Sequence, residues 1–188
     1  MRIIAFVAFM LIAGVCDNAY GDDESRDLSS VEKATFAEAD DEMSRGHCGV
    51  AWNSVWDLFV GGSSNASGWL AAAIVLKGLV PPGSTTDGIS QGRHAFILTA
   101  YSVASGNSDD LKLFRLIHSA IGVHNTRFLN CIDNQPENAQ SCLNEAIENG
   151  VVPKLDSYAE EIALLAQGRL SEARCDPEAA VLPPELWP

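Results

Sequence analysis

Glycine and proline residues divide this chain into short segments, and this constrains its fold more than any other feature. Stops such as Gly61-Gly62, Pro81-Pro82-Gly83 and Asn149-Gly150 separate stretches that are rich in apolar residues. Within these stretches the apolar residues recur every three or four positions, which is the spacing of a helix with one buried face. The sequence therefore predicts an all-α fold.

About seven short helices are expected, paired as repeat-like antiparallel hairpins and held by disulfides. Ser29 and Glu32 form a capping box at the start of the first helix, and Gly46 ends it. The stretch Ile74–Val80 is apolar enough to be a strand instead. The predicted helices are 29–45, Val50–Val60, Asn65–Lys77, His94–Val103, the stretch from Ser108 to the stop at Gly122, Glu137–Glu148 and Ser157–Ala173.

The N-terminus has the pattern of a secretory signal peptide. Arg2 is followed by the apolar run Ile3–Val15, and Ala19 and Gly21 are small residues of the kind that a signal peptidase reads. The run of about 13 residues is too short to cross a bilayer. We therefore expect cleavage after Gly21 and a periplasmic or secreted protein, with no transmembrane span and no lipid anchor at Cys16.

Four parts of the chain are predicted. These are a signal peptide at 1–21, an acidic flexible segment at 22–28, a single helical domain at 29–175 and an extended proline-rich tail at 176–188. In the tail, Pro183 and Pro184 cannot continue a helix. With Trp187 they form a possible binding segment that lies over the surface or docks on a neighbour.

The net charge of the chain is −13, and this limits its partners. Nucleic acids and anionic membranes would be repelled by such an excess of carboxylates, so neither is expected to bind. We expect a protein partner, whose identity the sequence does not give. No cofactor is expected.

Removal of Cys16 with the signal peptide leaves Cys48, Cys131, Cys142 and Cys175. An even number of cysteines in an oxidising compartment predicts two disulfides, each contributing about 2–4 kcal/mol to stability.

The spacing of the cysteines favours one pairing. Cys131 and Cys175 lie equally far on either side of Pro153, which would be the turn of a helical hairpin. This symmetry favours Cys131 with Cys175, and Cys48 with Cys142. A local bridge between Cys131 and Cys142 is the alternative.

No catalytic or metal site is predicted. His47 next to Cys48 could suggest a nucleophile and its base, but a cysteine of an exported protein is more often bridged. His94, His118 and His124 do not have the spacing of zinc ligands.

Carboxylates and tryptophans also have more ordinary explanations. Asp40-Asp41-Glu42 lacks the spacing of a calcium loop and is expected to be a solvated helix face. Glu160 and Glu161 are neighbours on a helix and should point apart. Trp52, Trp56 and Trp69 could line a ligand site, but their helical spacing favours the core.

Two stretches resemble known families. Arg93–Asn107 resembles the second helix of a Sel-like repeat, a relative of the tetratricopeptide repeat, and Asn65–Gly78 resembles its first helix. Glu160–Arg174 is similar to a tetratricopeptide helix, turn and helix. Phe128–Cys175 resembles the C-terminal half of the small periplasmic immunity proteins of the Rap/Tai kind, which protect bacteria against type VI secretion effectors. Either resemblance implies a binding protein without chemistry of its own.

These observations predict an exported, non-enzymatic helical module that acts through protein–protein contact. A periplasmic immunity or inhibitor protein against a secreted toxin is one alternative. A cell-wall-acting hydrolase is the other, because paired carboxylates are brought together by folding and leave no local motif.

Overall fold

The computed structural model describes residues 28–84, 89–106, 108–121, 126–167 and 172–179. The predicted signal peptide, nearly all of the acidic segment and the tail residues Pro183, Pro184 and Trp187 lie outside this part of the chain. At the start of the predicted extended tail, Pro177–Ala179 forms a short 3-10 helix.

The described residues are mostly helical, as predicted. They form eight α-helices, two short 3-10 helices and a two-stranded antiparallel sheet. The helices are α1 (Ser30–Ser44), α2 (Cys48–Val60), α3 (Ser64–Lys77), α4 (Ile89–Val103), α5 (Ser108–Ile121), α6 (Thr126–Asn134), α7 (Ala139–Glu148) and α8 (Leu155–Ala166). The 3-10 helices are η2 (Pro136–Asn138) and η3 (Pro177–Ala179), and the strands are β1 (Leu79–Val80) and β2 (Arg174–Cys175).

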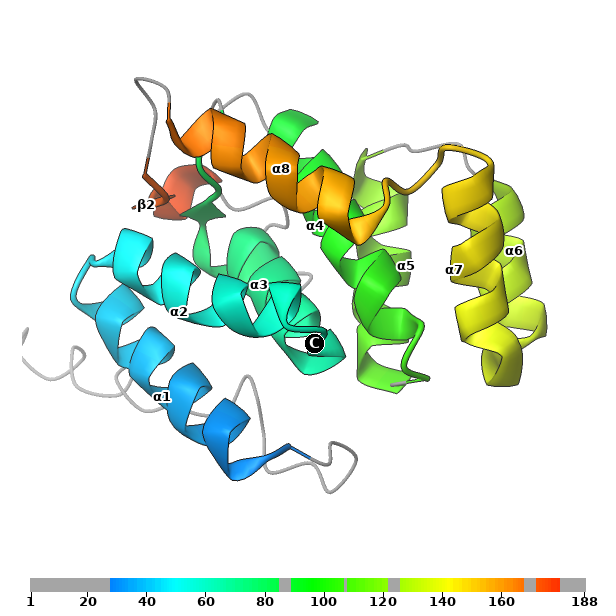
Figure 1. The fold of residues 1–188 in the computed structure, drawn as a ribbon, viewed down its shortest axis with the longest axis horizontal. Coiled ribbons are helices and arrows are strands. Elements are labelled where there is room, and N and C mark those ends of the chain that lie inside the picture. The colour runs from blue at the N-terminus through cyan, green and yellow to red at the C-terminus, as the bar shows by residue number, and fades with distance from the viewer. Residues whose placement is uncertain (1–27, 85–88, 107, 122–125, 168–171, 180–188) are drawn as a thin grey trace, which may run out of the picture.

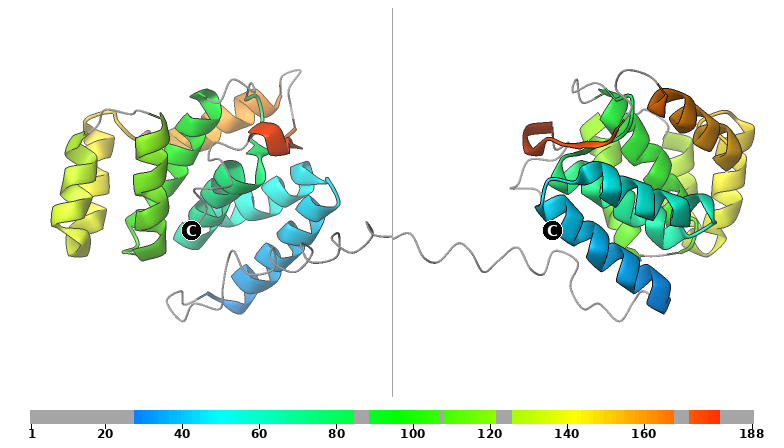
Figure 2. Two further views of the ribbon diagram at one scale, coloured as in Figure 1. Left: turned by 180° about the vertical axis from the view of Figure 1, so that it is seen from behind. Right: turned by 60° about the vertical axis from the view of Figure 1, so that its left-hand side comes forward.

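The helices follow one another across the molecule. Helices α1 and α2 lie at one end, α3, α4 and α5 in the middle, and α6 and α7 at the other end (Figures 1 and 2). Helix α8 crosses back over the top in the view of Figure 1, so it leaves its neighbour in sequence, α7, and packs against α2. This return path brings two helices together that are about a hundred residues apart in the sequence.

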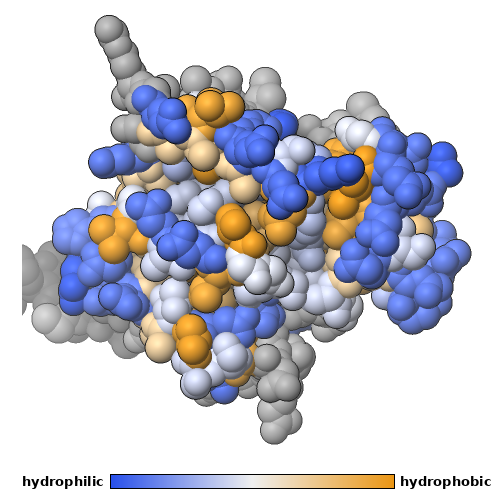
Figure 3. Space-filling view, viewed as in Figure 1, coloured by the Kyte–Doolittle hydropathy of each residue, from blue (hydrophilic) through white to orange (hydrophobic). Residues whose placement is uncertain are grey.

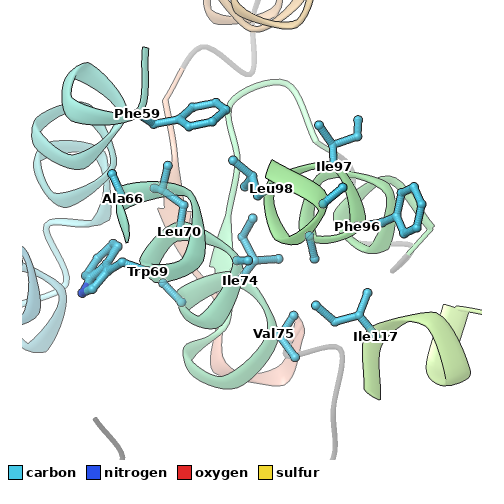
Figure 4. Packing of buried hydrophobic residues seen from close by; sticks show 14 of the residues in the cluster. Phe59, Ala66, Trp69, Leu70, Ile74, Val75, Phe96, Ile97, Leu98 and Ile117 are labelled. Carbon is cyan, nitrogen blue, oxygen red and sulfur yellow. The ribbon is translucent and has the colours of Figure 1, made fainter. Parts of the chain in front are cut away.

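Helix α3 is the centre of the core. Every residue from Ala66 to Val75 is buried, as expected for a helix that is apolar on all sides. Figure 4 shows Leu70 and Ile74 of α3 among Phe59 of α2 and Leu98 of α4. The core position predicted for Trp69 is therefore confirmed, and the helix is buried on more than the one face that the pattern predicts.

Helices α3 and α4 run antiparallel and approach closely at Gly68. A β-carbon at Gly68 would lie 2.6 Å from Oγ of Ser102 and 2.8 Å from a carboxylate oxygen of Asp110. Ser102 donates a hydrogen bond to this buried carboxylate. Gly68 thus leaves room for a polar contact between the end of α4 and the start of α5.

The first helix begins at the predicted capping box. The backbone N–H of Glu32 donates to Oγ of Ser29 at 3.2 Å, and the Glu32 carboxylate accepts from the Ser29 N–H at 2.8 Å. The other carboxylate oxygen of Glu32 accepts from Ser63 and Asn65 at the start of α3. Partial burial raises the pKa of Glu32, but hydrogen bonds from Ser63, Ser29 and Asn65 outweigh it and hold the pKa at about 2. One carboxylate therefore caps α1 and ties it to α3.

The ambiguous stretch Ile74–Val80 is both helix and strand. Helix α3 continues to Lys77, and Leu79 and Val80 then pair with Cys175 and Arg174. Gly78 makes the turn with φ +67°, and a β-carbon there would lie 2.1 Å from the carbonyl oxygen of Asp176. Only glycine allows this approach, which fixes the C-terminal segment to the core.

Three helix predictions need correction. The sequence pattern does not predict helix α6, because its nine residues lie in a polar stretch between the fifth and sixth predicted helices. Helix α4 begins earlier than predicted, at Ile89. Helix α8 covers Leu155–Ala166 and does not reach residue 173, since Arg174 and Cys175 are in a strand.

All four described cysteines are bridged, but the favoured pairing is wrong. Cys48 is bonded to Cys175 and Cys131 to Cys142, so the local alternative is present. The symmetry about Pro153 fails because α6 and α7 fold back on each other through η2. That turn places Cys131 and Cys142 with their Cα atoms 5.7 Å apart.

No helix of the described residues combines the length and the apolar character needed to cross a membrane.

Candidate functional site

A cleft of about 890 Å³ opens between α2, α8 and the segment that carries β2. Clefts of roughly 300–1,000 Å³ are typical of ligand sites. Its walls include the apolar residues Val50, Trp52, Trp56, Ile162, Ala163 and Ala166, together with Asn53, Pro82 and the Cys48–Cys175 bridge. The polar groups of the wall with ionisable side chains are His47, Glu172 and Arg174. The cleft is thus lined by apolar side chains with a few charged ones at its edge.

Helix α2 supplies one wall through two neighbouring faces. Trp52 is buried in the core and stacks on Trp56, with ring centroids 5.1 Å apart and planes inclined by 17°. Phe59 and Tyr158 contact Trp56 at centroid distances of 5.2 and 5.6 Å. Trp56 is itself only half-buried. Its indole is therefore held firmly by three aromatic rings while part of it remains open to the cleft.

Helix α8 supplies the opposite wall. Ile162 is buried, whereas Ala163 faces solvent beside it and Ala166 is half-buried. The small side chains of the two alanines leave the space that forms the cleft. On the α2 wall, Val50 is 55% exposed. Large apolar side chains at the surface are a common mark of contact sites when they gather.

Figure 3 shows hydrophobic residues scattered among hydrophilic ones over the face that carries α2 and α8. The apolar surface is therefore discontinuous, and polar groups separate its parts.

The Cys48–Cys175 bridge closes the end of the cleft. Cys48 is the first residue of α2, and Cys175 belongs to β2. The backbone of Ala173 runs close to α2, since a β-carbon at Gly49 would meet its carbonyl oxygen at 3.5 Å. The guanidinium of Arg174 donates to the carbonyl oxygen of Ser84 at 3.2 Å. The end wall is thus fixed covalently and by hydrogen bonds.

A cluster of polar side chains joins α8 to α4. His94 of α4 is buried and its Nδ1 lies 2.8 Å from the hydroxyl of Tyr158. Arg93 donates to both carboxylate oxygens of Glu161, at 2.6 and 2.9 Å. Burial and the nearby Arg93 charge lower the pKa of His94 to about 4, and burial raises the pKa of Tyr158. The hydrogen bonds from Arg93 lower the pKa of Glu161.

These groups are not arranged for proton transfer into the cleft. His94 and Tyr158 are both buried, and neither belongs to the described lining. The cluster therefore positions α8 against α4.

The predicted histidines do not come together. His47 is exposed at the cleft edge and its Nδ1 lies 2.8 Å from the carboxylate of Glu42. His94 is buried, and His118 on α5 lies beside Phe114. His124 lies outside the described residues. Within the described ranges, no group of three or more histidine, cysteine or acidic side chains could hold a metal ion.

The acidic run of α1 is engaged in ion pairs within the helix and with α3. Asp40 binds Lys77 at 2.6 Å, Asp41 binds Arg45 at 2.6 Å, and Glu42 binds both Arg45 and His47. Glu160 is exposed, whereas its neighbour Glu161 pairs with Arg93. The expectation that Glu160 and Glu161 point apart is confirmed.

The three predicted tryptophans have two different roles. Trp52 and Trp69 are in the core, as their spacing predicts, but Trp56 lies between the core and the cleft. No sequence pattern indicates the alanine wall on α8 or the strand β2. One signal is present for the other wall, because Val50, Asn53 and Trp56 share a face of α2 that does not include the most buried residues.

The fold and its bridges define a mostly helical, disulfide-bridged protein with an open cleft at one end. Comparison of the chain with protein-family models, with curated proteins and with solved structures found no match.

Proposed function

We propose that this protein is an exported binding module that holds a protein partner in the cleft between α2 and α8. The observation that carries the proposal is the half-buried Trp56, which three aromatic rings hold at the wall of an apolar cleft of about 890 Å³. Rigid aromatic side chains in desolvated pockets are the residues that most often dominate the affinity of protein interfaces.

Export is supported by two separate features. The sequence begins with the pattern of a secretory signal, and the folded part contains two disulfides. Disulfides persist in the periplasm and outside the cell, where thiols are not kept reduced. The two together support a periplasmic or secreted location.

A binding role also fits the chemistry of the cleft wall. Glu172 is the carboxylate among the described lining residues, and glycoside hydrolysis by the usual mechanisms needs two carboxyl groups at a defined separation. Val50 and Ala163, in contrast, offer exposed apolar surface on the two walls of the cleft. Such a surface suits contact with another protein.

Site-specific photo-crosslinking in the producing cell tests the proposal. A crosslinking phenylalanine analogue is placed at Val50 or Ala163 at the cleft, and at Gln140, an exposed residue of α7, as the matched control. We expect one discrete adduct from both cleft positions and none from Gln140. The adduct should be lost when Trp56→Ala is added in a variant that remains folded.

Two results would contradict the proposal. One is a failure of both cleft positions to crosslink, or equal crosslinking from Gln140. The other is release of cell-wall fragments by the purified protein, abolished by Glu172→Gln without unfolding. If the adduct contains a toxin, the module is the inhibitor that the C-terminal resemblance implies.

A further inference from the structure

Resting on the proposed function, we infer that the segment held in the cleft is cationic and amphipathic: its apolar side chains contact Trp56, Val50 and Ala163, and its lysines or arginines face Asp57, Glu160 and Glu172.

The charge balance of the molecule is the first step. Six basic side chains of the described residues are paired with carboxylates of the same chain: Arg45, Lys77, Arg93, Lys112, Arg115 and Arg127. The whole chain has 25 acidic and 12 basic residues. Most of the positive charge of the described residues is thus neutralised internally, and the carboxylates in excess remain for a partner.

Some of these carboxylates border the cleft. Asp57 is exposed one turn after Asn53, a residue of the cleft wall, and Glu160 is exposed one turn before Ala163 on the opposite wall. Glu172 is exposed in the end wall. Among the described ion pairs none involves Asp57, Glu160 or Glu172, whereas Glu161 is occupied by Arg93.

His47 and Arg174 only partly offset the negative charge of the three carboxylates at the cleft. His47 lies against Glu42, and Arg174 donates to the carbonyl oxygen of Ser84. Both groups are at the end of the cleft near the Cys48–Cys175 bridge. Asp57 and Glu160 flank the part that contains Trp56. A partner with positive charges on both sides of an apolar face would therefore match the two walls.

The exposed apolar side chains of α2 would contact the apolar face of such a partner. Val50 and Val60 are exposed on the same face of α2, with Asn53 and Asp57 between them. Their separation of ten residues corresponds to about 15 Å along a helix. An amphipathic segment laid in a groove between helices is a recurring form of peptide recognition.

Three synthetic peptides of equal length separate charge from apolar contact. One alternates lysine and leucine with helical spacing, the second replaces leucine by serine, and the third replaces lysine by glutamate. Binding to the purified protein is measured by calorimetry at physiological salt. We expect binding of the lysine–leucine peptide alone, weakened by added salt.

Matched charge variants locate the binding site. The cleft variant is Asp57→Asn with Glu160→Gln and Glu172→Gln, and the control is Glu137→Gln with Glu148→Gln and Glu178→Gln, three exposed carboxylates elsewhere. Each exposed charge pair contributes roughly 0.2–1 kcal/mol. We therefore expect about tenfold weaker binding to the cleft variant. The control variant should bind almost as well as the unchanged protein.

The outcomes separate the two proposals. Equal weakening in both variants shows general attraction to an acidic protein and overturns the inference. Binding of the serine or glutamate peptide as tight as that of the lysine–leucine peptide also overturns it. If the cleft positions crosslink to a partner in cells but the lysine–leucine peptide does not bind, only the inference fails. A lack of crosslinking from the cleft contradicts the proposed function itself.

Discussion

The two disulfides hold regions of different construction. The Cys48–Cys175 bridge belongs to a body made of α1–α5, α8 and the small sheet, and it joins cysteines 127 residues apart. The Cys131–Cys142 bridge belongs to the α6–α7 hairpin and joins cysteines 11 residues apart. The body is built from contacts between distant parts of the chain, whereas the hairpin is a local unit.

The hairpin is attached to the body through a small contact. Phe128 packs against Phe114 and Phe96, with ring centroids 5.4 and 6.4 Å apart. Arg115 of α5 binds Asp133 of α6 at 2.5 Å. In the body, by comparison, ten successive residues of α3 are buried. We expect the body to determine global stability and the hairpin to open separately.

Removal of the bridges should give the largest effects. Loop-closure entropy predicts a loss of about 5 kcal/mol for Cys48→Ala with Cys175→Ala, and about 3 kcal/mol for Cys131→Ala with Cys142→Ala. Equilibrium unfolding in guanidinium measures both. A hairpin variant that loses as much as the body variant would show that the two regions do not differ in this way.

A glycine of the body should tolerate substitution less than a glycine outside it. Gly78→Ala combines a positive φ with a clash against the Asp176 carbonyl oxygen, so we expect a loss of about 2–5 kcal/mol. Gly106 also has a positive φ, but a β-carbon there would meet no atom within 4 Å, and Gly106→Ala should cost about 1–2 kcal/mol. Thermal unfolding compares the two. Equal losses would mean that the close approach at Gly78 contributes nothing.

Acid should weaken the body through His94. Its pKa is about 4 in the folded protein against 6.5 ordinarily, so the unfolded chain binds a proton between these values that the folded chain does not. The free energy of unfolding should therefore be constant above pH 6.5 and fall by about 3 kcal/mol on acidification to pH 4. His94→Gln should flatten this dependence above about pH 5, whereas below it Glu32 and Glu161, whose pKa values folding also lowers, retain part of the dependence. An undiminished slope between pH 6.5 and about 5 in His94→Gln would contradict the assignment.

The smallest effect should come from the ion pair that attaches the hairpin. Asp133→Asn removes the partner of Arg115, and half-exposed pairs of this kind contribute about 0.2–1 kcal/mol. Hydrogen exchange should become faster in α6 and α7 and stay unchanged in α3. Faster exchange in α3 as well would show that hairpin and body open together.

The local features of the fold could be predicted from the sequence. The capping box at Ser29 and Glu32, the end of α3 at Lys77 and the buried face of α2 all follow from side chains within one or two helical turns. Such signals depend on local hydrogen bonds and on backbone freedom, which the sequence displays directly.

Long-range features could not be predicted in the same way. Helix α6 is polar on most of its surface, so the apolar spacing does not reveal it. Without α6 the turn between α6 and α7 is misplaced, and the cysteines are then paired wrongly. The cleft depends on α8 returning to α2 and on β2 pairing with β1, which no local pattern specifies. The helical spacing of Trp56 predicts a core position, because apolar residues with that spacing usually form the buried face of a helix. Its half-exposed position follows only from the alanines opposite it.

The short bridge of the hairpin has a consequence for the order in which cysteines oxidise. In a chain that emerges from its N-terminus, Cys48 meets Cys131 and Cys142 before Cys175 has appeared. Those two cysteines are separated by 11 residues, and closing so small a loop costs less entropy than reaching back to Cys48. Once Cys131 and Cys142 are bonded to each other, neither can form a non-native disulfide with Cys48. The Cys131–Cys142 bridge thereby favours correct formation of the Cys48–Cys175 bridge. This effect on folding is separate from its contribution to the stability of the folded protein.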